Sequence, residues 1–133
     1  MRLSSFTRLL LVFTVLVATG CAKSADPKRP LEKIEKEVVS MSVADLESNA
    51  KLYAAAIRAE KAKIMKVQVQ IQKMPIDKVF NNKGMIRDIA ETGRRAEALF
   101  ERYQTYVKAF QEKGGDPGKV QLVLGQPAAA DVA

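Results

Sequence analysis

The chain has 133 residues and a formal net charge of +7, from 22 Lys and Arg against 15 Asp and Glu. This length suits a single domain. It contains no His and one Cys, which excludes the commonest general base, a disulfide within the chain and a thiolate zinc site. We therefore predict a non-enzyme without metal or cofactor; a Ser–Lys pair built on Ser40, Ser42 or Ser48 is the enzymatic alternative.

Residues 1–20 have the pattern of a secretory signal peptide. Arg2 and Arg8 precede an apolar run at 9–18, and this run is shorter than the ~20 residues that a membrane-spanning helix needs. It leads into Leu16-Val17-Ala18-Thr19-Gly20-Cys21, which resembles the lipobox of bacterial lipoproteins. The resemblance implies removal of 1–20 and a covalent lipid on Cys21, a diacylglyceryl group with an N-acyl chain such as palmitate. The alternative is cleavage near Ala18 or Gly20 that leaves a free thiol.

The residues after Cys21 bear on localisation in the cell envelope. Lipoproteins facing the periplasm are sorted by the positions that follow the cysteine, here Ala22-Lys23-Ser24. The absence of Asp at position 22 resembles outer-membrane lipoproteins of enteric bacteria. Lys23-Ser24 resembles an inner-membrane retention signal of pseudomonads. We expect the outer membrane, with the inner membrane as the alternative.

Charge and export together restrict the expected partners. Without residues 1–20 the chain has 20 basic and 15 acidic residues, a net charge of +5. Export argues against nucleic acid, which a basic chain could otherwise bind. The expected partners are the membrane, through the lipid anchor, and an unidentified envelope protein. Association into a homo-oligomer is a further possibility.

The exported part begins with residues 21–30, a polar stretch with two prolines that predicts a lipidated N-terminus and an extended tether of up to ~30 Å. Pro30 suits the first position of a helix. The following apolar residues have the 3 and 4 spacing of one helical face: Leu31, Ile34, Val38 and Met41. We predict a short helix at about 31–40, which opens a helical domain at 31–113.

A longer helix is predicted at about 43–73. Ser42 with Asp45 resembles a capping box, and Pro75 ends the pattern. The repeat between them is typical of the seam of a coiled coil: Val43, Leu46, Ala50, Tyr53, Ile57, Glu60, Ile64, Val67, Ile71 and Met74. Residues 67–72 also alternate as a β-strand does, so a strand there is the alternative.

A second long helix is predicted at about 85–113, after a connection at 74–84 with the turn residues Asn81 to Gly84. Gly114 and Gly115 end it. Its seam is predicted to comprise Ile86, Ile89, Gly93, Ala96, Phe100, Tyr103, Val107 and Phe110. The two long helices match in length and should fold as an antiparallel hairpin, with facing residue numbers summing to about 159.

The expected fold class is therefore all-α: a long coiled-coil-like helical hairpin with a short N-terminal helix and a mostly irregular C-terminal tail at 114–133. Large side chains should face small ones, Phe100 and Tyr103 against Ala54 to Ala56, and Ile64 and Met65 against Gly93 and Ala96. Val120 to Leu124 could be a strand offered to a partner, but a tail that rests on its own helices is favoured.

Two regions are candidate partner-binding surfaces. The turn end is basic, with Lys73, Lys78 and Lys83, and could bind an acidic surface. The other end has an apolar stripe that includes Leu99 and Tyr106; it would be an open groove unless the 31–41 helix covers it, and we expect it to be covered.

Taken together, these patterns predict a non-enzymatic, lipid-anchored envelope protein that acts as a scaffold, adaptor or assembly factor through protein–protein contacts. Secretion pilot lipoproteins and conjugal entry-exclusion lipoproteins are similar in size and general plan. The alternative is a module that binds polyanions of the cell wall or lipopolysaccharide. Glu60 and Arg95 should form a structural ion pair.

Overall fold

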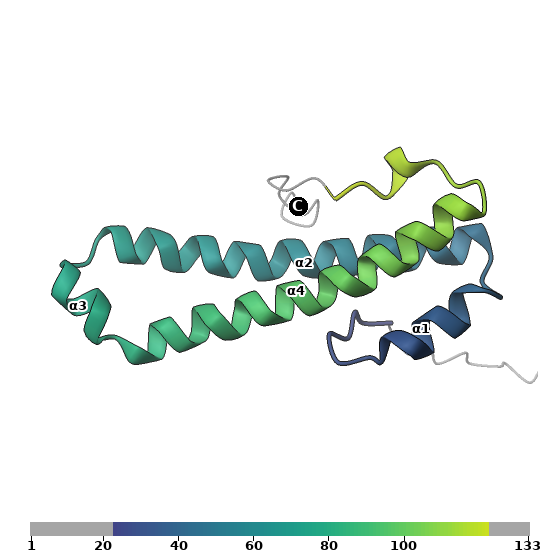
Figure 1. Ribbon diagram of the computed structural model, residues 1–133. Helices are drawn as coiled ribbons and strands as arrows, with labels where there is room; N and C mark the ends of the chain where they lie inside the picture. Colours follow the sequence, from purple (N-terminus) through teal and green to yellow (C-terminus); the bar gives the residue numbers. More distant parts are fainter. Residues whose placement is uncertain (1–22, 123–133) are drawn as a thin grey trace, which may run out of the picture.

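The structure is a computed structural model that describes residues 23–122, and this part of the chain is helical without a strand (Figure 1). Four α-helices and a short 3-10 helix follow one another along it. Their bounds are Leu31–Val38 (α1), Val43–Gln72 (α2), Ile76–Asn81 (α3), Lys83–Glu112 (α4) and Pro117–Lys119 (η1). The two long helices begin and end within two residues of the predicted positions.

Helices α2 and α4 form the predicted antiparallel hairpin (Figure 1). Tyr53 of α2 and Tyr106 of α4 pack against each other with ring centroids 5.5 Å apart. This pair has the predicted register, because the two residue numbers sum to 159. Residues 67–72 belong to α2, so the strand alternative for this stretch is wrong. The helical period of the surrounding residues outweighs its local β-branched alternation.

The start of α2 is fixed by Ser42 as predicted. The Ser42 hydroxyl oxygen accepts a hydrogen bond from the backbone N–H of Asp45 at 3.1 Å, and the hydroxyl donates to the Asp45 carboxylate at 2.7 Å. A side-chain acceptor of this kind satisfies one of the backbone donors that a helix start leaves open. Met74 and Pro75 then lie outside the helix.

The connection between the long helices contains α3 (Ile76–Asn81), which the sequence analysis did not predict. The Pro75 carbonyl accepts hydrogen bonds from the backbone N–H groups of Lys78 and Val79. Residues 76–81 contain neither Gly nor Pro, so nothing in them prevents a helical turn. Between α3 and α4 only Asn82 lies outside a helix. Its side chain accepts a hydrogen bond from the backbone N–H of Met85 and caps α4.

The end of α4 has the predicted glycine cap. Gly114 has a φ of 83°, and the backbone N–H groups of Gly114 and Gly115 donate to the carbonyls of Gln111 and Phe110. This is the Schellman pattern, which needs a residue that tolerates positive φ. A Cβ at Gly115 would lie 2.4 Å from the Phe110 ring, so this second glycine is required by packing.

The hydrophobic core lies at the base of the hairpin, which we define as the end opposite α3. It combines residues of α1, both long helices and the segment after α4, and it buries two tyrosine rings almost completely. Its members are Ile34, Val38, Leu46, Ala50, Tyr53, Ala54, Ile57, Leu99, Tyr103, Tyr106, Ala109, Phe110 and Val120. The core therefore joins segments from both ends of the described chain.

The buried face of α4 differs from the predicted seam. The buried residues of this helix are Thr92, Leu99, Arg102, Tyr103, Tyr106, Ala109 and Phe110. Phe100 is 40% exposed and Ile86 is 49% exposed, although both belong to the predicted seam. The reason is that α1 also packs on α4, so the inward face of α4 is set by two neighbours and includes the stripe of Leu99 and Tyr106.

The distal half of the hairpin, residues 61–91, has no buried residue. Met65 is 62% exposed, and a Cβ added at Gly93 would meet no atom within 4 Å. The predicted close packing of Ile64 and Met65 against Gly93 and Ala96 is therefore wrong. Two helices alone give each other only one contact face, whereas the base has four packed segments.

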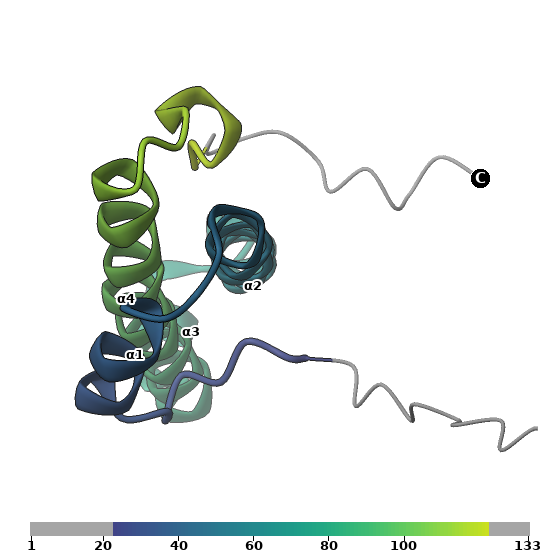
Figure 2. The same cartoon turned by 90° about the vertical axis from the view of Figure 1, so that its right-hand side faces the viewer.

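The segment after α4 returns along the base, on the side of the hairpin opposite α1 (Figures 1 and 2). Val120 is 2% exposed, and its carbonyl accepts a hydrogen bond of 2.5 Å from the Tyr103 hydroxyl. The expectation of a tail resting on its own helices is confirmed for residues 114–122. Residues 123–133, which include the end of the candidate strand at Val120 to Leu124, lie outside the described part.

Candidate binding surfaces

The apolar stripe at the base is closed, as we expected. Tyr106 is fully buried and Leu99 is 3% exposed, so neither side chain is available to a partner. Ile34 and Val38 of α1 belong to the same core. The 31–41 region therefore covers this surface, and the structure brings Leu99 and Tyr106 together as core residues rather than as a binding site.

The N-terminal segment at residues 26–30 is fixed to the base by hydrogen bonds that reach three helices. Arg102 Nε donates to the Arg29 carbonyl at 2.8 Å, and Arg29 Nη1 donates to the Tyr106 hydroxyl at 3.1 Å. Arg29 also pairs with Glu37 of α1. The Tyr53 hydroxyl donates to the carbonyl of Asp26 at 3.3 Å. We call this set of contacts the N-terminal clamp.

The clamp corrects the prediction of a tether at 21–30. Residues 26–30 pack against the hairpin, and Ala25 lies against the core. A buried Arg explains why the segment is held: the guanidinium of Arg102 is nearly enclosed and needs acceptors, and the carbonyls of Arg29 and Ala98 supply them. Composition alone could not show this, because polar residues with prolines are also typical of a free linker.

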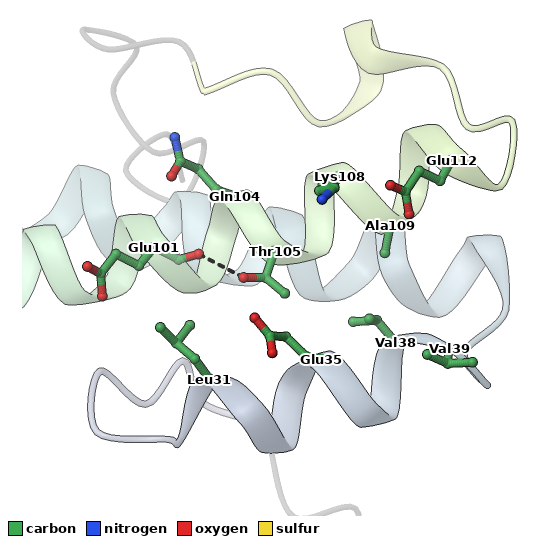
Figure 3. Close-up of a pocket in the computed structure, with 10 residues that line it drawn as sticks. All are labelled: Leu31, Glu35, Val38, Val39, Glu101, Gln104, Thr105, Lys108, Ala109 and Glu112. Carbon is green, nitrogen blue, oxygen red and sulfur yellow. Dashed lines mark hydrogen bonds between the residues drawn. The ribbon is translucent and has the colours of Figure 1, made fainter.

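A groove of about 480 Å³ runs between α1 and α4 on the outside of the base (Figure 3). Its floor is apolar, and Val39 at one end is 75% exposed. Three carboxylates and a single ammonium group line it, so its charge is negative. The lining residues are Leu31, Glu35, Val38, Val39, Glu101, Gln104, Thr105, Lys108, Ala109 and Glu112.

The side chain of Glu35 stands between the two helices of this groove, opposite Thr105 (Figure 3). The Thr105 hydroxyl is satisfied within α4, since it donates to the Glu101 carbonyl at 3.1 Å. At the end of α1, Lys113 donates to the carbonyls of Val39 and Met41 at 2.8 and 2.6 Å. These bonds fix the spacing of α1 and α4, so the groove has defined walls. No local pattern in the sequence indicates this groove.

The basic candidates Lys73, Lys78 and Lys83 all lie exposed around α3 at the distal end. Two large apolar side chains of α3 lie among them: Ile76 is 75% exposed and Phe80 is 72% exposed. Neither residue is among the predicted candidates, because residues 74–84 are predicted as a connection between the long helices. The sequence signal for them is the spacing of two large apolar residues, Ile76 and Phe80, four positions apart, as on one face of a helix.

The excess positive charge of the described chain is concentrated in residues 61–87, which include the distal end of the hairpin. Residues 61–87 contain seven Lys and Arg and one Asp, a net charge of +6. Residues 23–60 contain seven basic and seven acidic residues, and residues 88–122 contain six of each. The described residues outside 61–87 are therefore neutral overall, and the hairpin is electrically asymmetric along its length.

Glu60 marks the boundary between these two halves. Its carboxylate forms ion pairs with Lys63 at 2.8 Å and with Arg95 of α4 at 3.5 Å. The Glu60 side chain is 12% exposed. The predicted pairing of Glu60 with Arg95 is confirmed. The pair links α2 to α4 where the buried core ends, which is a structural role.

Residues 23–122 contain no group of three or more potential metal ligands, and none of their helices combines the length and hydropathy needed to cross a membrane. Cys21, the predicted lipidation site, lies outside the described residues. Comparison of the chain with family models, curated proteins and solved structures gives no match.

Proposed function

We propose that this chain is a lipid-anchored protein of the bacterial cell envelope that works by binding, as a scaffold or adaptor, without catalysing a reaction. The observation that supports this most directly is the groove between α1 and α4, which lies on the same base that the N-terminal clamp holds. The lipidated residue would be Cys21, and the groove would then face partners close to the membrane. The signal peptide and lipobox pattern support the anchor.

The chemistry of the groove indicates the kind of protein segment that would fit. Val38 and Ala109 offer an apolar floor that Val39 extends at one end, and Glu35, Glu101 and Glu112 add negative charge around it. An amphipathic helix with an apolar face and flanking Lys or Arg side chains would complement both features. The proposed partner is therefore an envelope protein that presents such a helix.

The anchor is tested by the intact mass of protein extracted from membranes. We expect a mass that begins at Cys21 and includes the diacylglyceryl and N-acyl groups. A Cys21→Ser variant should lose this mass and its membrane attachment. Unmodified protein that begins elsewhere and has a free thiol would contradict the anchor, whatever the groove binds.

The groove is tested by photo-crosslinking in cells. A photoreactive residue at Gln104, at the α4 rim of the groove, should give one discrete crosslinked product, whereas the same residue at Ser48, exposed on α2, should not. The double variant Glu35→Lys, Glu112→Lys should abolish the Gln104 product while the circular dichroism spectrum and Tm are unchanged. A product of twice the chain's mass would identify a second copy as the partner. Identical products from both positions would contradict a specific groove.

The separation of charge favours a second candidate function, the binding of a polyanion at the distal end. A net charge of +6 within residues 61–87 produces a local positive potential, and the other described residues, which are neutral overall, do not oppose it. Such binding should weaken as the salt concentration rises, since exposed charges are screened within about 10 Å at 0.1 M salt. Contact at the groove should change much less with salt.

A further inference from the structure

The distal end of the hairpin presents apolar side chains that the described structure leaves uncovered. Ile76 and Phe80 are four residues apart in α3, so they share one face of that short helix. They are 75% and 72% exposed, at the end of the molecule farthest from the core (Figure 1). Met65 and Val69 of α2 add exposed apolar surface at 62% and 50%.

Lysines lie close to these apolar residues along the chain. Lys73 precedes α3, Lys78 lies within it, and Lys83 follows it at the start of α4. All three are exposed. Their long aliphatic stems allow each ammonium group to stay in a polar layer while neighbouring apolar groups enter a less polar one. The distal end therefore presents apolar groups and cations within the same few turns of helix.

This combination discriminates between possible anionic ligands. A dissolved polyanion satisfies the lysines but gives Ile76 and Phe80 nothing to enter. An anionic bilayer satisfies both, because its headgroups attract basic residues while its interface accepts aromatic and aliphatic side chains. We propose that residues 73–83 bind an anionic lipid surface, with Ile76 and Phe80 inserted between headgroups and Lys73, Lys78 and Lys83 at the level of the phosphates.

This inference narrows the second candidate function to one ligand class, and it requires no lipid on Cys21. The test therefore uses protein that lacks residues 1–21. The packed segments lie between Ala25 and Leu122, so this removal leaves every described core contact in place. The probes are vesicles of phosphatidylglycerol with phosphatidylethanolamine, and vesicles of phosphatidylcholine alone. We expect cosedimentation with the anionic vesicles only, and less of it at higher salt.

Charge variants measure the electrostatic part. Each basic residue near an anionic leaflet strengthens binding roughly fivefold, so the triple variant Lys73→Gln, Lys78→Gln, Lys83→Gln should weaken vesicle binding about a hundredfold. The matched control is Lys33→Gln, Lys36→Gln, Lys119→Gln. It removes the same charge from exposed positions away from the distal end, and it should bind vesicles within about twofold of the parent.

Apolar variants measure insertion. The double variant Ile76→Ser, Phe80→Ser should weaken vesicle binding at least about tenfold. Serine gains no free energy from moving out of water into the bilayer interface, whereas Ile and Phe do. Val43→Ser at the start of α2 is the control, since Val43 is an exposed apolar residue of the base that lies outside the groove, and it should bind vesicles like the parent. No residue of α3 is buried, so the Tm should be unchanged in all these variants.

A fluorescent reporter gives an independent measurement of depth. The chain contains no Trp, so Phe80→Trp introduces a single reporter. Its emission should shift to shorter wavelength with anionic vesicles, and lipids with brominated acyl chains should quench it. Val39→Trp should show neither effect.

The outcomes separate this inference from the functions on which it builds. Anionic-vesicle binding that depends on the lysines but not on Ile76 and Phe80, with no quenching of the Phe80→Trp reporter, would overturn insertion and leave a charge-only polyanion site. Failure to bind anionic vesicles, with salt-sensitive binding to soluble polyphosphate, would also overturn it. Neither result would affect the groove or the lipid on Cys21.

Discussion

At the scale of single residues, the base depends on tyrosines that are enclosed and still hydrogen-bonded. The Tyr106 hydroxyl accepts from Arg29, and the Tyr103 hydroxyl donates to Val120. Each ring fills the core while its hydroxyl forms a hydrogen bond with the segment that precedes α1 or follows α4. A phenylalanine at either position would keep the apolar contact and lose the tie to the N-terminal or C-terminal segment.

Burial of these phenols predicts a loss of stability in alkali. Burial raises the pKa of Tyr106 above its ordinary 10.0, against the opposing effect of the Arg29 charge, and burial likewise raises the pKa of Tyr103. In the unfolded chain both phenols titrate near 10. Above that pH the unfolded state has lost protons that the folded state keeps, so the free energy of unfolding must fall as the pH rises.

The measurement is urea unfolding at about pH 8 and about pH 10.5. Tyr106→Phe should lose less stability between the two values than the parent does, even though it starts from lower stability. Titration of lysines is common to both proteins and does not affect the comparison. An equal loss in both proteins would show that Tyr106 contributes nothing to the alkaline transition.

At the scale of elements, the hairpin is packed at one end and open at the other. The buried residues of α2 all lie between Leu46 and Ile57, and those of α4 begin at Thr92. Helices that share little apolar contact depend on their own backbone hydrogen bonds, which open locally with little cost. The distal turns should therefore open without unfolding the base.

Amide hydrogen exchange tests this asymmetry. Amides of residues 61–72 and 83–91 should exchange at least about tenfold faster than those of 47–58 and 99–110, because the first group can open locally and the second only with the core. Lowering the stability of the core should speed exchange in the base and leave the distal amides unchanged. Equal protection along the whole of α2 would contradict this division.

The two long helices could be predicted because each carries a sustained apolar period and clear terminal signals, Ser42 with Pro75 for α2 and Gly114 for α4. The helix α3 was missed because Asn81 to Gly84 resembles a long turn, whereas Asn82 alone makes the break. The buried face of α4 is predicted only in part, with Tyr103 and Phe110 buried but Ile86 and Phe100 exposed, because a coiled-coil seam assumes one partner. Which stripe turns inward depends on where α1 packs, and no local pattern contains that information.

The candidate sites divide in the same way. The sequence identified the distal lysines, because charge is visible residue by residue, and it identified the ion pair of Glu60 and Arg95 from the hairpin register. It could not identify the groove, whose walls come from α1 and α4 about 70 residues apart. The N-terminal clamp was equally hidden, since Arg29 and Arg102 become partners only after folding.

At the scale of the whole molecule, α1 is part of the single core rather than an appendage. Ile34 is completely buried, so Ile34→Ala should remove about 2–5 kcal/mol from the free energy of unfolding. For a domain of this size the Tm should fall by roughly 10 °C or more. Val39→Ala, at an exposed position directly after α1, should change stability by less than about 0.5 kcal/mol.

Thermal unfolding followed by circular dichroism measures both variants. A single transition that moves to lower temperature as a unit is expected for Ile34→Ala. If this variant instead kept the Tm of the parent, α1 would not belong to the cooperative unit, and the groove that it forms with α4 would have no fixed wall.

The N-terminal clamp also sets how far the protein can travel. If Cys21 carries the proposed lipid, only five residue steps separate the bilayer surface from Asp26. Their fully extended length is at most ~17 Å. The protein would then diffuse only along the membrane, within a layer that extends from the lipid surface by about the length of the protein. Within that layer two membrane-held partners meet at a high effective concentration, so even a weakly binding groove would be occupied by its partner. The same two proteins released from the membrane would rarely be bound to each other.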